Sequence, residues 1–287
     1  DFYAKFDLAK KIFKTVDETL GRPLSKLILE GPESELKLTQ NTQPAIMTVG
    51  VSIFKVLNEN FGLNLNDSKF FAGHSLGEYT ALVCSGALSI EKAAYLLYER
   101  GKAMQESVPS GHGSMTAVLG LTINEVEEEI SSLPKDEICE IANDNSPGQV
   151  VVSGTKKIIE TLNENLKKKR KKGILLPVSA PFHCSLMNSA LDKMKSKIEE
   201  TDFNTPKPSI ISNVTANAED NAANIKTLLI KQIVSRVRWR ESVNYMMKNG
   251  VTNFIEIGPG KVLSGLVKKI DKNVKISNFN NVNDIEK

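Results

Sequence analysis

The stretch that decides the fold is "FFAGHSLGEYTALVCSGALS", residues 70–89, where a short apolar run enters Gly73-His74-Ser75-Leu76-Gly77 and then a helical pattern. A Gly-x-Ser-x-Gly at a strand-to-helix turn is where serine hydrolases and acyltransferases place a nucleophile. The glycines permit a turn too sharp for a side chain, so that the Ser75 hydroxyl projects from its tip. The alternative is that Ser75 only caps the following helix, as most serines before helices do. The flanking glycines favour the nucleophile, and the Leu76 N–H is then the expected oxyanion donor.

The segments on both sides of this turn predict an α/β protein. Apolar residues at helical spacing predict helices over 6–20 and 44–57, with Pro44 in a first turn, where proline is tolerated. Residues 111–179 alternate in the order βαββαβ, which is that of a ferredoxin-like unit. We therefore predict a small domain at 111–179, inserted into a larger α/β domain made of residues 1–110 and 180–287.

Composition limits the classes of function. The 287 residues are 40% hydrophobic, enough for a sizeable core, and 37 basic against 34 acidic residues are too balanced for a dedicated nucleic-acid binder. Cys84, Cys139 and Cys184 are scattered, which predicts neither a disulfide framework nor a zinc site. No apolar run approaches a membrane span, and no signal peptide opens the sequence. We expect a cytoplasmic protein with no metal, no nucleic-acid partner and no membrane segment.

A second unusual feature is an arginine on the apolar face of a helix. Ser89 is expected to cap the helix of "SIEKAAYLLYERGKAMQESV", and one stripe of it then contains Ala93, Leu97, Arg100, Met104 and Val108. Arg100 could extend to the edge of the core or pair with an internal carboxylate. It could also bind the carboxylate of a ligand as a bidentate fork. The helical pattern alone does not decide between these roles.

The third feature is a histidine that could act as a base. His74 lies inside the turn and His112 lies in "SGHGS", whereas His183 follows a strand and a Pro181 turn where the predicted insertion ends. A single histidine is more often structural. A serine nucleophile nevertheless requires a base with a pKa near 6.5, and His183 is the best-placed candidate.

Six blocks of sequence carry a family resemblance: "GHSLGEY", "YERGKAMQESVP", "NSPGQVVVSG", "APFHCSLM", "VRWRESV" and "EIGPGKVLSGL". In this order, and over nearly the whole chain, they resemble the malonyl-CoA:acyl-carrier-protein transacylases of bacterial fatty acid synthesis. The resemblance implies an α/β-hydrolase-like large domain with a ferredoxin-like insertion. It also implies malonyl-CoA and acyl carrier protein as substrate and partner, no cofactor, and a monomer.

The resemblance assigns roles residue by residue. It makes Ser75 the nucleophile that accepts the malonyl group, His183 its base and Arg100 the group that holds the malonyl carboxylate. In the family a main-chain carbonyl orients the histidine, and the matching residue in "LIKQIV" is Gln232. The resemblance also places four residues at the acyl pocket: Asn143, Asn145, Met104 and Phe182. In related polyketide synthase domains, a phenylalanine directly before the histidine goes with malonyl rather than methylmalonyl.

The chain departs from the family pattern at its start. Family members begin with a strand and a Gly-Gln-Gly-Ser-Gln loop whose glutamine completes the oxyanion hole, and we expect that this segment precedes Asp1 in the natural protein.

Three different functions would share some of these motifs. A serine esterase or thioesterase would have the same turn and would need Asp144 as the orienting acid. An acyltransferase of a polyketide pathway would have the same turn, base and arginine. An inactive carrier-protein-binding module would have the fold, but it would not be expected to keep Ser75, His183 and Arg100 together.

The basic run Lys167–Lys172, "KKKRKK", has the composition of a nuclear-localisation or nucleic-acid patch. We interpret it instead as the solvated C-terminal end of a helix, where cations suit the helix dipole. A third interpretation is that it attracts an acidic carrier protein or the phosphates of CoA.

Overall fold

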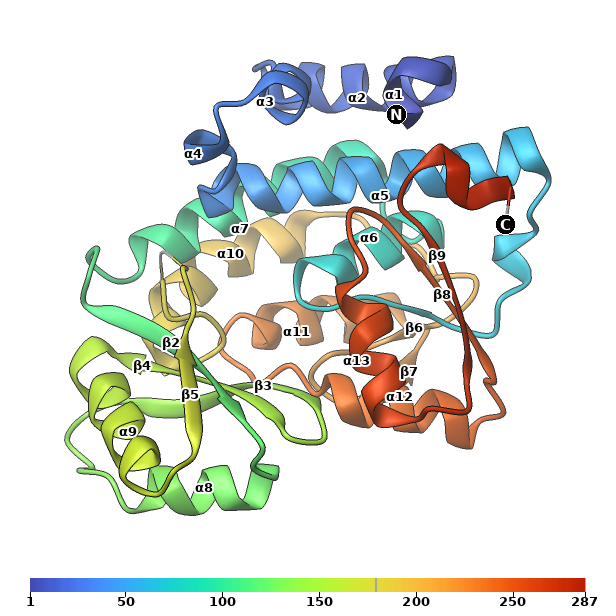
Figure 1. Cartoon of the computed structure of the whole chain (residues 1–287). Helices are drawn as coiled ribbons and strands as arrows, with labels where there is room; N and C mark the ends of the chain where they lie inside the picture. Colours follow the sequence, from blue (N-terminus) through green and yellow to red (C-terminus); the bar gives the residue numbers. More distant parts are fainter. Residues whose placement is uncertain (179, 287) are drawn as a thin grey trace.

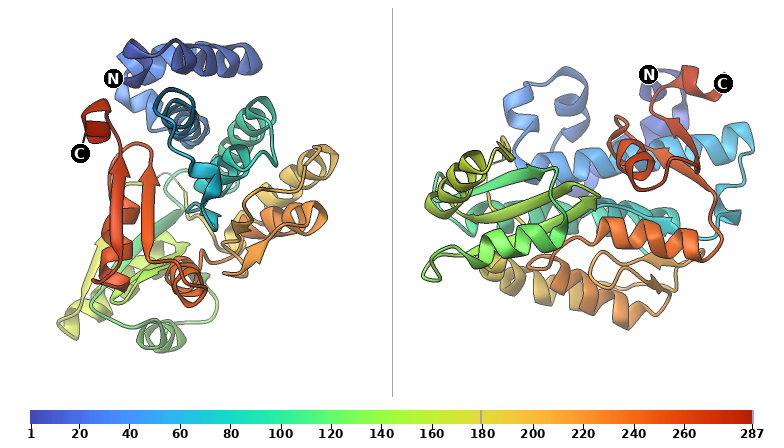
Figure 2. Two further views of the ribbon diagram at one scale, coloured as in Figure 1. Left: turned by 90° about the vertical axis from the view of Figure 1, so that its right-hand side faces the viewer. Right: turned by 60° about the horizontal axis from the view of Figure 1, so that its bottom comes forward.

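The chain is a mixed α/β protein in the computed structural model, which describes residues 1–178 and 180–286 (Figure 1). This agrees with the predicted fold class. The predicted end of the small domain at residue 179, and residue 287, lie outside the described residues. Figure 2 gives two further views, in which the segment of β2 to β5 lies away from the first helix of the chain.

The first elements are helical. They are α1 (Phe2–Lys5), α2 (Asp7–Leu20), α3 (Leu24–Glu30), α4 (Glu33–Leu36), α5 (Thr39–Phe61) and the 3₁₀ turn η1 (Leu65–Asp67). Helix α2 has the predicted bounds within one residue, and Gly21 ends it in a left-handed conformation (φ 61°). The predicted start of α5 at Pro44 is wrong, because the helix begins at Thr39 and the proline lies inside it. Side-chain bonds from Asn41 to the Glu35 carbonyl (2.7 Å) and from Thr42 to the Leu38 carbonyl (3.2 Å) support the earlier turn.

The turn of residues 70–89 joins strand β1 (Phe71–Ala72) to helices α6 (Leu76–Cys84) and α7 (Ile90–Glu106). Ser89 caps α7 as predicted, since its hydroxyl accepts the Lys92 N–H at 3.3 Å. Strand β1 pairs in parallel with β6 (Ile210–Ile211), which pairs antiparallel with β7 (Ala218–Glu219). The nucleophile turn is therefore held by a strand that comes about 140 residues later along the chain.

A second sheet forms from the middle of the chain. The predicted order βαββαβ is observed, as β2 (Gly113–Leu119), α8 (Ile123–Ser131), β3 (Cys139–Ser146), β4 (Gln149–Thr155), α9 (Lys156–Lys168) and β5 (Lys172–Leu175). Its strands lie in the spatial order β3-β4-β2-β5, and every pair is antiparallel. Helices α8 and α9 pack on the sheet around a separate apolar cluster that includes Val118, Val152 and Leu162 (Figure 1).

The C-terminal third returns to the larger body. It contains η2 (Ser185–Met187), α10 (Asn188–Glu200), α11 (Ala222–Gln232), α12 (Trp239–Lys248), β8 (Asn253–Ile257), α13 (Val262–Ile270), β9 (Lys275–Phe279) and η3 (Val282–Glu286). Strands β8 and β9 pair in parallel. The two ends of the chain meet, because the Val282 N–H donates to the Asp1 carboxylate at 3.0 Å (Figure 1).

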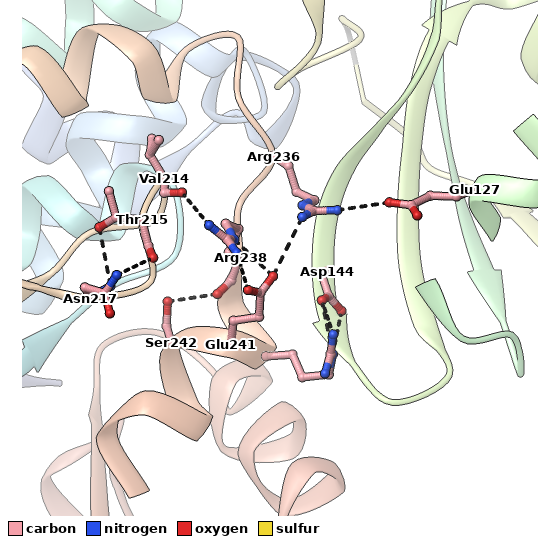
Figure 3. A network of polar contacts seen from close by, with 10 residues as sticks. Glu127, Asp144, Val214, Thr215, Asn217, Arg236, Arg238, Glu241 and Ser242 are labelled. Atoms are coloured by element: carbon pink, nitrogen blue, oxygen red, sulfur yellow. Dashed lines mark hydrogen bonds and ion pairs between the residues drawn. The ribbon is translucent and has the colours of Figure 1, made fainter. Parts of the chain in front are cut away.

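Polar contacts fasten the second sheet to the larger body. The Asp144 N–H donates to the Val237 carbonyl at 2.9 Å, and the Val237 N–H donates to the Ala142 carbonyl at 2.8 Å. Arg240 forms a bidentate ion pair with the buried Asp144 carboxylate, and its shortest contact is 2.8 Å. Figure 3 shows the contact at the Asp144 carboxylate and the ion pair from Arg236 to Glu127 of α8, which is 3.4 Å long.

Further expectations concern membranes, metals and cysteines. Over residues 1–178 and 180–286, no helix is both long and apolar enough to cross a bilayer. In the same part of the chain, no three His, Cys, Asp or Glu side chains are grouped as a metal site would require. Cys84, Cys139 and Cys184 are all unbonded thiols.

Candidate active site

The turn before α6 holds Ser75 in an unusual backbone conformation, with φ 52° and ψ −110°. A Cβ on Gly73 would lie 2.0 Å from the Gly77 carbonyl, so this close approach requires glycine at 73. Gly77 has open space around its missing side chain, so the expectation that both glycines are sterically required is wrong for the second one. Asn213 clamps the turn, because its Oδ1 accepts the Ser75 N–H at 2.6 Å and its Nδ2 donates to the Gly73 carbonyl at 2.8 Å.

The structure brings Ser75 and His183 together. Ser75 Oγ lies 2.7 Å from His183 Nε2, and His183 Nδ1 lies 2.9 Å from the Gln232 carbonyl oxygen. Because a carbonyl only accepts, Nδ1 must carry the proton, which leaves Nε2 free to accept the serine hydroxyl. His183 also has a positive φ of 59°, so both members of the pair lie in a backbone region that favours glycine.

His183 is held in its neutral form. Burial is the main cause that lowers its pKa to about 3, and the nearby Arg100 charge lowers it further. The imidazole is only 4% exposed. It is therefore an unprotonated base at neutral pH.

Arg100 is 1% exposed, and the rest of the predicted stripe on α7 is buried with it. Its guanidinium donates to the oxygens of three neutral groups: Gln43 Oε1 at 2.6 Å, Gln232 Oε1 at 2.9 Å and Ser75 Oγ at 3.1 Å. Within the described part of the chain, no carboxylate oxygen comes within 4 Å of the Arg100 nitrogens, and Nε has no partner. Arg100 therefore neither reaches the surface nor forms a contact ion pair, and its charge stands beside the nucleophile.

Two residues of this network were not found from the sequence. Gln43 lies on α5 and Glu78 lies one turn after Ser75 on α6, and both are buried. Glu78 Oε2 accepts the Gln232 Nε2–H at 2.7 Å and the Asn213 N–H at 3.0 Å. Burial raises the pKa of the Glu78 carboxyl to about 7. The available indication for Glu78 was that it is the one charged residue in the otherwise uncharged run 76–84.

The expected pocket residues divide into two groups. Asn143 and Asn145 do not contact the Ser75–His183 pair, because their amides lie against His74 Nε2, at 3.3 and 2.9 Å. Met104 is buried below Arg100, with its sulfur 3.9 Å from Gln43 Nε2.

Phe182 packs against both the large apolar core and a smaller cluster on the second sheet. Its carbonyl accepts the Ser153 hydroxyl at 2.6 Å, which fixes the residue directly before His183. Leu76 opens α6, where the first N–H groups of a helix have no partner within the helix. Its N–H is therefore available beside Ser75, as expected of an oxyanion donor.

An esterase would require Asp144 to orient the histidine. Asp144 instead binds Arg240 through both carboxylate oxygens, and His183 Nδ1 faces the Gln232 carbonyl. The basic run Lys167–Lys172 is exposed at the C-terminal end of α9, and Lys169 pairs with Glu129 at 2.7 Å. This placement agrees with the interpretation of the run as a solvated helix end.

Comparison with known proteins adds independent evidence. A family model described as "Acyl transferase domain" matches residues 2–283. The malonyl CoA-acyl carrier protein transacylase of Bacillus subtilis is 43% identical over 277 residues, which are 96% of this chain and 86% of that protein.

Solved structures agree with this match. The acyl-carrier-protein S-malonyltransferase of Bartonella henselae superposes with a TM-score of 0.95 at 42% identity, covering 99% of this chain and 91% of that one. A malonyl-transacylase in complex with the acyl-carrier protein of a type II polyketide synthase gives a TM-score of 0.95 at 36% identity, covering 100% and 92%. The chain therefore belongs to the malonyl CoA-acyl carrier protein transacylase family of acyltransferases.

Proposed function

We propose that this chain transfers a malonyl group from malonyl-CoA to the phosphopantetheine thiol of acyl carrier protein, through a malonyl ester on Ser75. The observation that carries the proposal is the double contact at Ser75 Oγ, which lies 2.7 Å from His183 Nε2 and 3.1 Å from the Arg100 guanidinium. A nucleophile, a neutral base and an uncompensated cation thus meet at one oxygen. An acyl group that carries a free carboxylate fits this combination.

In the first half-reaction Ser75 Oγ attacks the thioester carbonyl while His183 Nε2 takes its proton. The Leu76 N–H stabilises the negative charge that develops on the carbonyl oxygen. The tetrahedral intermediate then expels the CoA thiolate, which receives the proton from His183, and a malonyl-serine ester remains. The Gln232 carbonyl keeps the ring oriented and stabilises the transient imidazolium, so the pair needs no third carboxylate.

The second half-reaction repeats these steps in reverse. The carrier-protein thiol gives its proton to His183 and attacks the ester, and Ser75 regains the proton as it leaves. Arg100 holds the malonyl carboxylate throughout as a bidentate fork. Acetyl has no carboxylate and would leave the guanidinium unpaired, which gives a preference for malonyl.

The architecture that serves this chemistry is also a proposal. We assign residues 1–110 and 180–287 to an α/β-hydrolase-like catalytic domain and residues 111–179 to a ferredoxin-like domain. The antiparallel order β3-β4-β2-β5 and the parallel pairing of β1 with β6 support this division. A cytoplasmic monomer that uses no cofactor and binds no nucleic acid stays a prediction. An acyl carrier protein of a polyketide pathway is the second candidate acceptor, because one similar structure is bound to such a protein.

The deciding experiment is intact-protein mass spectrometry after addition of malonyl-CoA. We expect one malonyl adduct, located by proteolysis to the peptide that contains Ser75. The Ser75→Ala variant should form no adduct and transfer nothing to holo acyl carrier protein. An adduct on another residue, or full transfer by Ser75→Ala, would disprove the assignment.

A further inference from the structure

The mechanism above gives no role to the carboxylate of Glu78. This side chain is 1% exposed and lies three residues after the nucleophile on α6. Its Oε2 accepts two hydrogen bonds, from Gln232 Nε2 at 2.7 Å and from the Asn213 N–H at 3.0 Å. A carboxylate buried beside an active site is costly unless its contacts are needed.

Gln232 Nε2 donates to Glu78 Oε2 at 2.7 Å and to the Ser75 carbonyl at 3.2 Å, and these contacts fix which way the amide points. A carboxylate only accepts hydrogen bonds and a guanidinium only donates them. With Nε2 facing Glu78, Oε1 must face the other way, and it accepts from Arg100 Nη2 at 2.9 Å. The reversed amide would set carbonyl against carboxylate and NH₂ against guanidinium, so both partners select the same orientation.

The amide also keeps the two charges from pairing directly. Arg100 and Glu78 are not within 4 Å of each other, and in the described chain each of the three acceptors of Arg100 is a neutral oxygen. A contact ion pair would have to break before a ligand carboxylate could bind. Through Gln232, the carboxylate fixes the guanidinium in place without a direct contact between the two charges.

We propose that Glu78 is a positioning residue, which holds Arg100 beside Ser75 through the Gln232 amide and thereby sets the preference for malonyl over acetyl. This inference rests on the proposed function. A merely structural Glu78 would support the turn through Asn213, and its loss would lower both acyl transfers by the same factor. Loss of Arg100 positioning should instead lower transfer of the acyl group that carries a carboxylate more than transfer of acetyl.

The test compares kcat/KM for malonyl-CoA and acetyl-CoA, with holo acyl carrier protein as acceptor. Glu78→Leu removes the shorter of the two contacts that orient the Gln232 NH₂ group and leaves only the 3.2 Å contact with the Ser75 carbonyl, and we expect the malonyl-to-acetyl ratio to fall on the order of 10-fold or more. Glu78→Gln should keep the ratio. The Asn213 N–H needs an oxygen acceptor and so selects the orientation of the new amide, whose oxygen then also faces Gln232 Nε2. Asp17→Ala is the control, since it removes a carboxylate that accepts a backbone N–H (Ser25, 2.8 Å) far from the site and should leave the ratio unchanged.

A double-mutant cycle tests the route through Gln232. Gln232→Leu keeps the main-chain carbonyl that orients His183, and should lower the ratio about as much as Glu78→Leu. Adding Glu78→Leu to Gln232→Leu should lower the ratio no further. Equal losses for both acyl groups, or fully additive effects on the ratio, would overturn the proposal.

If Glu78→Leu does not fold, the malonyl-to-acetyl ratios of Gln232→Leu and Glu78→Gln still test the proposal. An unchanged ratio in Gln232→Leu, or a fallen one in Glu78→Gln, would contradict positioning through the amide. A wild-type protein that forms no malonyl adduct would contradict the proposed function itself, and is thereby distinguished from failure of this inference.

Discussion

Replacing Arg100 with methionine should separate binding of the malonyl carboxylate from the chemistry at Ser75. Methionine keeps an apolar side chain in the buried stripe but cannot form the fork. Hydrogen bonds to a charged group contribute about 1.5–3 kcal/mol each, so two lost bonds amount to about 3–6 kcal/mol. The kcat/KM for malonyl-CoA should therefore fall roughly 10²–10⁴-fold.

Acetyl transfer should respond in the opposite direction. Acetyl makes no fork, and the Arg100 charge is one of the causes that lower the pKa of His183 to about 3. Removing the charge raises the pKa of the base, so acylation by acetyl-CoA should stay level or rise. On the proposed mechanism a bound malonyl carboxylate would act in the same direction, because it would neutralise the Arg100 charge whereas acetyl would not.

The assay is single-turnover formation of the acyl-serine ester from each thioester, followed by quenching and mass spectrometry. Arg100→Lys keeps the charge without the planar fork and should lie between the wild type and Arg100→Met. Arg22→Met removes an arginine that stacks on Tyr98 at 5.7 Å, outside the site, and serves as control. If Arg100→Met keeps the wild-type preference for malonyl over acetyl, the arginine is structural and the carboxylate-binding role is wrong.

Four more measurements test separate parts of the structure. His183→Ala should slow single-turnover acylation roughly 10²–10⁴-fold, and an unchanged rate would mean that another group is the base. Arg240→Met should lower the free energy of unfolding by about 3–5 kcal/mol in denaturant titrations, since it leaves the Asp144 carboxylate buried and unpaired. Adding Asp144→Leu should restore most of the lost stability. A loss below about 1 kcal/mol in Arg240→Met would contradict the role of the ion pair. Phe182→Ser should raise methylmalonyl use relative to malonyl by a factor equivalent to about 1–3 kcal/mol without changing the rejection of acetyl, as measured by competing the thioesters. The pKa of Glu78 is raised from 4.5 to about 7, so its stabilising contribution is complete below pH 4.5 and is lost as pH rises through 7. The melting temperature of Glu78→Gln should therefore rise relative to that of the wild type over this pH range. A difference in melting temperature that stays constant with pH would show that the pKa of the carboxyl is not raised.

The sequence predicted those parts of the site that have a local pattern. The Ser75 turn follows from glycine spacing beside an apolar run, and the burial of Arg100 follows from helical period alone. The start of α5 could not be placed in the same way, because the turn before Pro44 depends on side-chain bonds from Asn41 and Thr42 that no propensity encodes. Strands β7 and β9 were not predicted for a related reason, since each pairs with a neighbour and lacks a strong alternation of its own.

The contacts among distant residues were beyond prediction from pattern. Gln232 was expected to supply a main-chain carbonyl, but its side chain also joins Arg100 to Glu78, which lie 132 and 154 positions earlier in the chain. A buried glutamine can serve many partners, and only the folded chain selects these two. Asn143 and Asn145 were expected at the acyl pocket, and nothing in the sequence indicated that their amides lie against His74.

The strained backbone at Ser75 and His183 is held by contacts from distant segments of the chain. Both residues have positive φ values, of 52° and 59°, and such conformations cost on the order of 1–3 kcal/mol each unless surrounding contacts fix them. Asn213 holds the Ser75 backbone, and the Gln232 carbonyl holds the His183 ring. Both clamps come from segments after residue 210, so the turn of residues 70–89 has its catalytic geometry only once the C-terminal third has folded against it. The contact between Ser75 and His183 thus depends on the completed tertiary structure and not on the local motif alone.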